Sequence, residues 1–184
     1  MEDNNIAFGV KFINPQEIIA TLEIEAGMNV ADFGCGTGYF TFPLAERVGQ
    51  TGRVYALDIL KDKLETVESE AKILGLGNIL PKRVNLEAIG GSKLTDASLD
   101  WVFLVTMLFQ NKDKEVIIKE AKRVLKTGGK ILVIEWNKKD ASIGPANNLR
   151  VAEDEISTLF QANGLTMLSE IKISDFHFGL IFQN

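Results

Sequence analysis

The chain has 184 residues, 46% of them hydrophobic and 24% charged, which fits one compact globular domain over residues 1–184. Its net charge of −5 disfavours a nonspecific nucleic-acid-binding face, because phosphate contacts need clustered lysine and arginine. The single cysteine, the missing signal-like leader and the short apolar runs lead us to expect a cytoplasmic protein with no membrane span.

Amphipathic segments along the chain predict helices. From residue 60 to residue 74, apolar side chains recur at intervals of three and four, which places them on one helical face before Gly75 ends the helix. A second helix is expected in "KDKEVIIKEAKRVL", before "KTGGK", and a third in "AEDEISTLFQANG", where acidic residues in the first turn suit the helix dipole. The segment through Arg47 lies between two predicted strands and is also expected to be helical.

The strands between these helices are nearly continuous apolar runs, as in a parallel sheet covered by helices on both faces. Only Ser174 and Asp175 separate the last two runs, so these predict an antiparallel hairpin. Pro81 favours an irregular or edge position for the third strand. We expect strands near 28–33, 53–57, 79–85, 99–105, 129–135, 165–173 and 176–183.

These elements predict the α/β fold class, as a three-layer Rossmann-like sandwich around a seven-stranded, mostly parallel sheet. Sequential right-handed crossovers place the switch point beside the first strand, and the terminal hairpin inserts back into the sheet. The expected order is therefore 3-2-1-4-5-7-6, with only the seventh strand antiparallel. The stretch "NKKDASIGPANN" is the longest one expected to be irregular.

The segment "VADFGCGTGYF" suggests a ligand. Gly34, Gly36 and Gly38 read G-x-G-x-G, whereas a dinucleotide fingerprint reads G-x-G-x-x-G and would have its third glycine at Tyr39. Asp32 precedes the loop, where its carboxylate would repel a pyrophosphate and attract an ammonium or sulfonium group. The pattern therefore favours a ligand that has a positive centre and no phosphate.

Asp58 ends the next strand, where a carboxylate can accept both hydroxyls of a ribose. Asp32 and Asp58 together describe a nucleoside with an amino-acid-like tail, which is S-adenosylmethionine. Two structural alternatives stay open: the glycines can form only a tight turn, and Asp58 can cap the helix that follows it.

The motifs "VADFGCGTGYFT", "GRVYALDI", "SLDWVFL" and "EAKRVLKTGGKILVIEW" occur in this order within residues 10 to 183. They resemble the successive motifs of class I S-adenosylmethionine-dependent methyltransferases, in the ubiquinone/menaquinone-biosynthesis-like (type 11) group. The resemblance also implies a seven-stranded sheet whose last strand is antiparallel, which agrees with the hairpin.

The resemblance further implies a role for each motif position. Asp32 and the backbone of Gly34, Gly36 and Gly38 would surround the methionine tail, and Asp58 would bind the ribose. Ile59 would pack on the adenine. Asn85 and Leu86 stand where many relatives have an aspartate that accepts the adenine amine and an amide that donates to the ring; an asparagine oxygen can also accept. Thr106 would lie at the amino-acid end of the cofactor, where the substrate pocket begins.

The sequence singles out no catalytic residue and no metal site. Methyl transfer from a sulfonium needs mainly in-line alignment and exclusion of water. Cys35 is interpreted as a packed residue, because no histidine or basic residue lies nearby to activate it, and His177 as structural or exposed.

A small-molecule methyl acceptor is the remaining partner class. The segment "VTMLFQN" has no Asn/Asp-Pro-Pro-Tyr/Phe motif, which disfavours amino methylation of DNA bases or glutamine. A Pro-Cys nucleophile is absent, and the single cysteine argues against arsenite methylation. We expect the acceptor to contact residues 4–14, the turn after Thr106 and residues 136–150. Two other function classes stay open: a non-catalytic S-adenosylmethionine-binding protein and, disfavoured by the glycine spacing, a nicotinamide-dependent oxidoreductase.

Overall fold

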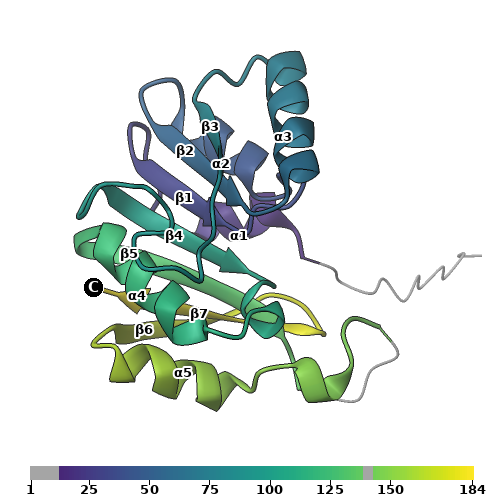
Figure 1. Ribbon diagram of the computed structural model, residues 1–184, viewed down its shortest axis with the longest axis vertical. Helices are drawn as coiled ribbons and strands as arrows, with labels where there is room; N and C mark the ends of the chain where they lie inside the picture. The colour runs from purple at the N-terminus through teal and green to yellow at the C-terminus, as the bar shows by residue number, and fades with distance from the viewer. Residues whose placement is uncertain (1–12, 139–142) are drawn as a thin grey trace, which may run out of the picture.

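A twisted seven-stranded sheet forms the centre of the molecule (Figure 1). The computed structural model describes residues 13–138 and 143–184. The strand order is β3-β2-β1-β4-β5-β7-β6, and β7 runs antiparallel to both of its neighbours, so the predicted order and directions are confirmed. The strands are β1 (Asn29–Phe33), β2 (Arg53–Asp58), β3 (Ile79–Arg83), β4 (Leu99–Val105), β5 (Leu125–Trp136), β6 (Thr166–Lys172) and β7 (His177–Gln183).

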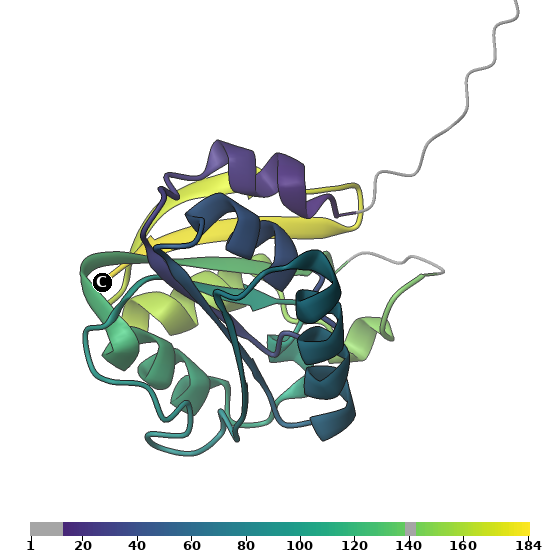
Figure 2. The same cartoon turned by 90° about the horizontal axis from the view of Figure 1, so that it is seen from above.

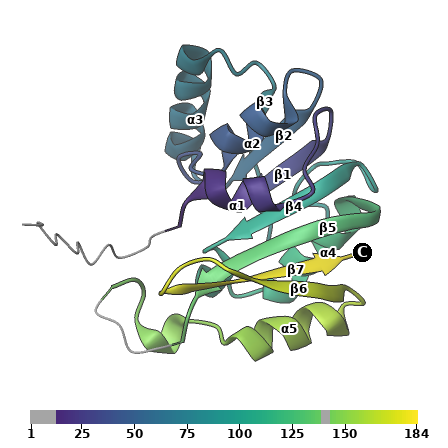
Figure 3. The ribbon, with the colours of Figure 1, turned by 180° about the vertical axis from the view of Figure 1, so that it is seen from behind.

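Helices cover both faces of the sheet, as Figures 2 and 3 show. Side chains of α1, α2 and α3 enter one hydrophobic cluster, and those of α4 and α5 enter the other. The helices are α1 (Pro15–Thr21), α2 (Thr41–Val48), α3 (Lys61–Leu74), α4 (Lys114–Val124) and α5 (Glu153–Ala162), with single 3₁₀ turns at Leu108–Gln110 and Asn147–Leu149. None of the helices in the described ranges combines the length and apolar character that a membrane crossing requires.

The apolar runs of the central strands have the expected cause. Neighbouring residues of a strand point to opposite faces, so a strand with helices on both sides is apolar at most of its positions. In β4 and β5, Val102, Leu104, Ile131 and Val133 enter the cluster under α4 and α5, whereas Trp101, Phe103, Leu132 and Ile134 enter the cluster under α1, α2 and α3.

Two elements differ from the expectation. Helix α1 was not expected, although Asn14 caps it and Pro15 occupies its first position, which is a standard helix start. Strand β5 begins at Leu125 instead of near residue 129, because Leu125 pairs with Leu99 before the pairing is interrupted and resumes at Lys130 opposite Trp101. Pro81 lies in β3, at the edge of the sheet, as expected.

Phe160 tests the packing of α5 on the sheet. Its ring is fully buried and stacks on that of Phe182 in β7, with the ring centroids 4.4 Å apart. Because Phe160→Ala leaves a cavity between helix and sheet, we expect it to lower the free energy of unfolding by about 3–5 kcal/mol. Chemical denaturation measures this. Gln161→Ala, on the exposed side of the same helix, is the control and should change stability by less than about 0.5 kcal/mol.

Candidate functional site

A cavity of about 590 Å³ lies at the carboxyl ends of the parallel strands β1, β2 and β4. Loops that are far apart in the sequence meet there because parallel strands end at the same edge of a sheet. Eight of the nine predicted cofactor-binding residues line this cavity: Asp32, Gly34, Gly36, Asp58, Ile59, Asn85, Leu86 and Thr106.

The end of β2 holds the glycine loop in place. The backbone amides of Gly34 and Cys35 both donate to the carbonyl of Leu57, at 2.7 and 3.0 Å, and the amide of Gly36 donates to Asp58 Oδ2 at 2.9 Å. Gly36 has φ +54°, and a Cβ built on it would meet no atom within 4 Å, so its backbone borders open space. A ligand can therefore approach the main chain closely at this position.

Gly38 is the predicted residue that does not line the cavity. Its φ is +93°, and a Cβ on it would lie 2.6 Å from the ring of Phe42 in α2. Glycine is therefore required here for the packing of the loop against the helix. Gly38 can affect ligand binding only indirectly, because it sets the conformation of the loop whose other residues line the cavity.

Asp32 is a buried carboxylate at the floor of the cavity. Only 3% of the residue is exposed, and its Oδ2 accepts a hydrogen bond of 2.7 Å from Thr41 Oγ1 at the start of α2. Burial raises the pKa of Asp32 to about 6; the hydrogen bond from Thr41 opposes this rise, and the charge of Asp58 adds to it. A ligand cation near Asp32 would relieve the desolvation of its charge.

The Asp58 side chain lines the cavity and also accepts hydrogen bonds from two backbone amides. Its Oδ2 accepts from Gly36 N and its Oδ1 from Leu60 N, both at 2.9 Å. The second bond closes a local turn just before α3, whose N-cap is Leu60 and has no side-chain cap hydrogen bond, so the alternative that Asp58 caps this helix is wrong. A carboxylate has about four lone-pair sites, which leaves acceptor capacity for hydroxyl groups.

The segment after β3 forms another wall. Asn85 Oδ1 accepts from Glu87 N at 3.0 Å, and the Leu86 side chain is 8% exposed within the core. Glu87 also lines the cavity, and its Oε1 accepts from the amides of Lys112 and Asp113 at 2.7 and 2.9 Å. Glu87 was not expected as a site residue, because these partners lie 25 and 26 positions away and nothing local marks them.

The turn after β4 closes the site opposite β2. Thr106 has φ +47°, which is unusual for a residue other than glycine, and its amide donates to Ile134 O at 2.7 Å. Beneath the turn, fully buried Glu135 accepts from Leu108 N at 2.7 Å. Burial raises the pKa of Glu135 to about 7, against the opposing backbone hydrogen bonds. Its only sequence signal was an acid inside the apolar run "ILVIEW".

Of the residues expected to contact the acceptor, only some line the cavity. Ile13 lines the cavity, and its carbonyl accepts a 2.6 Å hydrogen bond from the hydroxyl of Tyr39, which lines it too. The rest of the expected N-terminal stretch up to residue 12, and residues 139–142, lie outside the described residues. The described residues of 136–150 do not line the cavity.

Cys35 and His177 have structural surroundings. Burial, together with the nearby charges of Asp32 and Asp58, raises the pKa of the Cys35 thiol, which suits a packed residue and not a nucleophile. His177 is 5% exposed, so the exposed alternative is wrong. Its Nδ1 lies 2.9 Å from Ser174 Oγ, and burial, followed by the charge of Arg150, lowers its pKa to about 4. In residues 13–138 and 143–184, His, Cys, Asp and Glu form no group of three or more that could hold a metal ion.

Comparison with known proteins gives consistent results. A family described as "Methyltransferase domain" matches residues 24–172. The ubiquinone/menaquinone biosynthesis C-methyltransferase UbiE of Pseudoalteromonas translucida is 32% identical over 139 residues, which are 75% of this chain and 54% of that protein. The chain thus spans about half the length of the curated relatives it matches.

Solved structures share the fold. A SAM-dependent methyltransferase from Aquifex aeolicus has a TM-score of 0.85 at 24% identity, covering 92% of this chain and 89% of that one. A putative type 11 methyltransferase from Sulfolobus solfataricus has a TM-score of 0.76 at 23% identity, covering 94% and 92%. At these identities the likeness shows the fold.

The buried charge of Asp32 predicts a pH-dependent cost in stability. Because the folded-state pKa is raised from 3.8 to about 6, the wild type loses stability as pH rises through this window and recovers none above it. Asp32→Asn keeps an acceptor for Thr41 without the charge. We expect it to be more stable than wild type at pH 8, by up to about 3 kcal/mol, with the difference vanishing near pH 4. Equal melting temperatures of the two proteins at pH 8 would contradict this.

Proposed function

The chain belongs to the class I S-adenosylmethionine-dependent methyltransferases, and from this premise we propose that it transfers the methyl group of S-adenosylmethionine to a small-molecule acceptor. One observation carries the proposal: two carboxylates, Asp32 and Asp58, flank a glycine loop whose backbone borders an open cavity. The cavity is large enough for a nucleoside with an amino-acid tail and has room for an acceptor beside it.

We assign the cofactor contacts as follows. Asp32 and the loop from Gly34 to Gly36 would hold the methionine tail, because the buried carboxylate gains most from a neighbouring cation. Asp58 would accept the ribose hydroxyls with the lone pairs that its backbone bonds leave free. Ile59, which is 54% exposed at the rim, offers an apolar surface to the adenine. Asn85 and Leu86 would contact the edge of the adenine ring.

S-adenosylmethionine supplies an already activated methyl group, so the protein contributes alignment and exclusion of water. The glycine loop and Asp58 fix one side of the cavity. The turn from Thr106 to Asn111 fixes the opposite side, where Gln110 Nε2 donates to Thr106 O and Asn111 Nδ2 to Met107 O. An acceptor held between these walls would approach the carbon–sulfur bond from the side opposite sulfur, which in-line displacement requires.

The relatives suggest the first acceptors to test. Their names describe methylation in ubiquinone and menaquinone biosynthesis. We therefore propose a small aromatic ring of the quinol type as the first acceptor class. A methyl-release screen over small quinols, phenols and amines tests the activity. Cofactor binding without methyl release to any class would instead favour a non-catalytic binding protein.

Asp58 tests the placement of the ribose. If its carboxylate accepts two hydroxyls, Asp58→Ala should weaken S-adenosylhomocysteine binding by roughly 2–4 kcal/mol, on the order of a hundredfold or more. Asn85→Ala should cost less, because it removes a neutral acceptor. Calorimetric titration measures both affinities. Asp58→Ala also frees the amides of Gly36 and Leu60, so we expect its unfolding free energy to fall by about 1–3 kcal/mol.

Asp62→Ala is the matched control. Asp62 is an exposed acid in the first turn of α3 and does not line the cavity. Its affinity for S-adenosylhomocysteine should equal that of the wild type. If Asp58→Ala also binds like the wild type, the ribose does not lie at Asp58 and the assignment of the whole site is wrong.

A further inference from the structure

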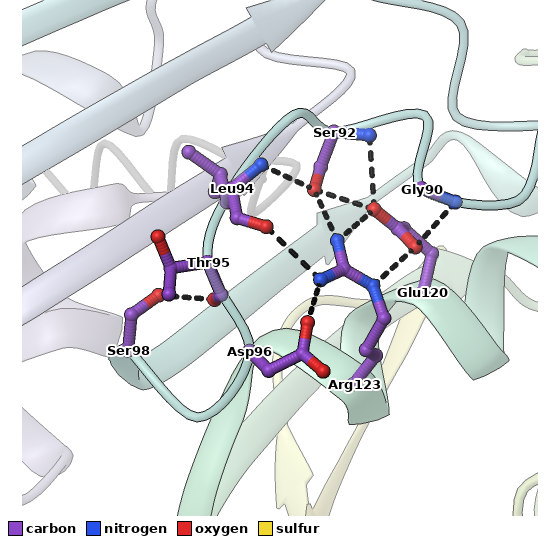
Figure 4. A network of polar contacts seen from close by, with 8 residues as sticks. All are labelled: Gly90, Ser92, Leu94, Thr95, Asp96, Ser98, Glu120 and Arg123. Carbon is purple, nitrogen blue, oxygen red and sulfur yellow. Dashed lines mark hydrogen bonds and ion pairs between the residues drawn. The ribbon is translucent and has the colours of Figure 1, made fainter.

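A buried polar cluster lies outside the cavity, between α4 and the segment that connects β3 to β4 (Figure 4). Its centre is Glu120, which is 3% exposed. Glu120 Oε1 accepts from the amide of Ser92 at 2.9 Å, from the hydroxyl of Ser92 and from Arg123 Nη2. Oε2 accepts from Gly90 N at 3.2 Å and from Arg123 Nε at 2.9 Å. Both carboxylate oxygens therefore accept hydrogen bonds from this segment and from Arg123.

Arg123 extends the same cluster. Its Nη1 donates to Leu94 O at 3.0 Å and forms an ion pair with Asp96, and its Nη2 lies 3.2 Å from Ser92 Oγ. Burial raises the pKa of Glu120, but the donors from Arg123 and Ser92 outweigh this effect and lower it to about 2. The carboxylate consequently stays charged at neutral pH.

The cluster fixes a turn that has little else to hold its tip. Ile89 is 95% exposed, and the two residues after it are glycines, so the tip places no apolar side chain in the core. Ser92, in contrast, is fully buried against Glu120. The polar contacts of Glu120 with Gly90 and Ser92 thus determine where this turn lies.

The turn rests directly on the wall of the cavity. A Cβ on Gly91 would lie 1.9 Å from the carbonyl oxygen of Asn85 and 2.7 Å from that of Ala88. The main chain of Gly91 therefore packs against the main chain of Asn85, which begins the cavity-lining segment Asn85–Leu86–Glu87. A displacement of the turn would move this wall.

We infer that Glu120 is a positioning residue for the nucleoside half of the cofactor, acting through the turn 88–92 on the wall at Asn85. This inference rests on the proposed function, since it concerns the same cavity. Glu120 does not line the cavity, so it has no direct contact to offer a ligand there. The turn both contacts Glu120 and packs against the wall, so we expect an effect of Glu120 on binding to pass through it.

Two variants perturb the link from its two ends. Glu120→Gln places an amide against Arg123 and weakens the hold on the turn. Gly91→Ala introduces a methyl group where Asn85 O lies. The ligands are S-adenosylhomocysteine and 5′-methylthioadenosine, which has the nucleoside without the amino-acid tail. Affinities are measured well below the melting temperature of each variant, where a loss of overall stability alone does not change binding.

We expect each variant to bind both ligands about tenfold more weakly, by the same factor for each ligand, because the defect lies at the nucleoside. Asp32→Asn should weaken only S-adenosylhomocysteine. Glu115→Ala is the control on α4: Glu115 is exposed, pairs with Lys119 at 2.7 Å and should leave both affinities unchanged.

The outcomes separate the two levels of the assignment. Wild-type affinity for 5′-methylthioadenosine in the folded variants would overturn the role of Glu120, and so would a loss confined to S-adenosylhomocysteine. If Glu120→Gln does not fold, Gly91→Ala and Ser92→Ala decide. Failure of the wild type to bind either ligand would instead overturn the proposed function.

Discussion

The rest of the site depends on the hydrogen bonds between the end of β2 and the glycine loop. The carbonyl of Leu57 and the carboxylate of Asp58 take three successive amides, those of Gly34, Cys35 and Gly36. The left-handed φ angles of Gly34 and Gly36 make this geometry possible, and a side chain at either position would be strained. Because Leu57 pairs with Phe33 in the sheet, the position of the loop follows from the register of β1 and β2.

Two buried acids near the cavity, Glu120 and Asp32, differ in how their charge is compensated. Glu120 has Arg123 and two backbone amides, and its pKa falls to about 2. Asp32 has one hydroxyl donor, and its pKa rises to about 6. Acids left short of donors lower stability, and they concentrate where ligands supply the missing partner. Glu120, whose charge is compensated within the protein, supports the structure, whereas Asp32, whose charge is not, faces the cavity.

The sequence determined the fold more completely than the site. The nearly continuous apolar runs predicted a parallel sheet covered by helices, Pro81 indicated an edge strand, and the short connection between the last two strands predicted a hairpin. The right-handed crossover rule then gave the strand order. Most of the predicted cofactor residues line one cavity, because the ends of parallel strands converge whatever their side chains.

The remaining features depend on contacts between distant parts of the chain. In the sequence Gly38 cannot be told from Gly36. Only the folded structure shows that Gly38 packs against the ring of Phe42 in α2, whereas Gly36 borders open space. Glu87 and Glu120 resemble ordinary surface acids in the sequence, and the backbone amides that donate to them lie 25 to 30 positions away. Helix α1 was within reach of sequence reasoning, since Asn14 and Pro15 mark its start, but its seven residues are too few for a clear period.

The place of β7 has a consequence for the order in which the chain assembles. The strand is the last one in the sequence, yet it lies between β5 and β6 and pairs with both along its length. Strands β1 to β4 can pair as soon as they are synthesised, whereas β6 has no sheet neighbour until β7 is available. The half of the sheet that carries the glycine loop is therefore able to form first, and the exposed edge of β5 awaits the final strand.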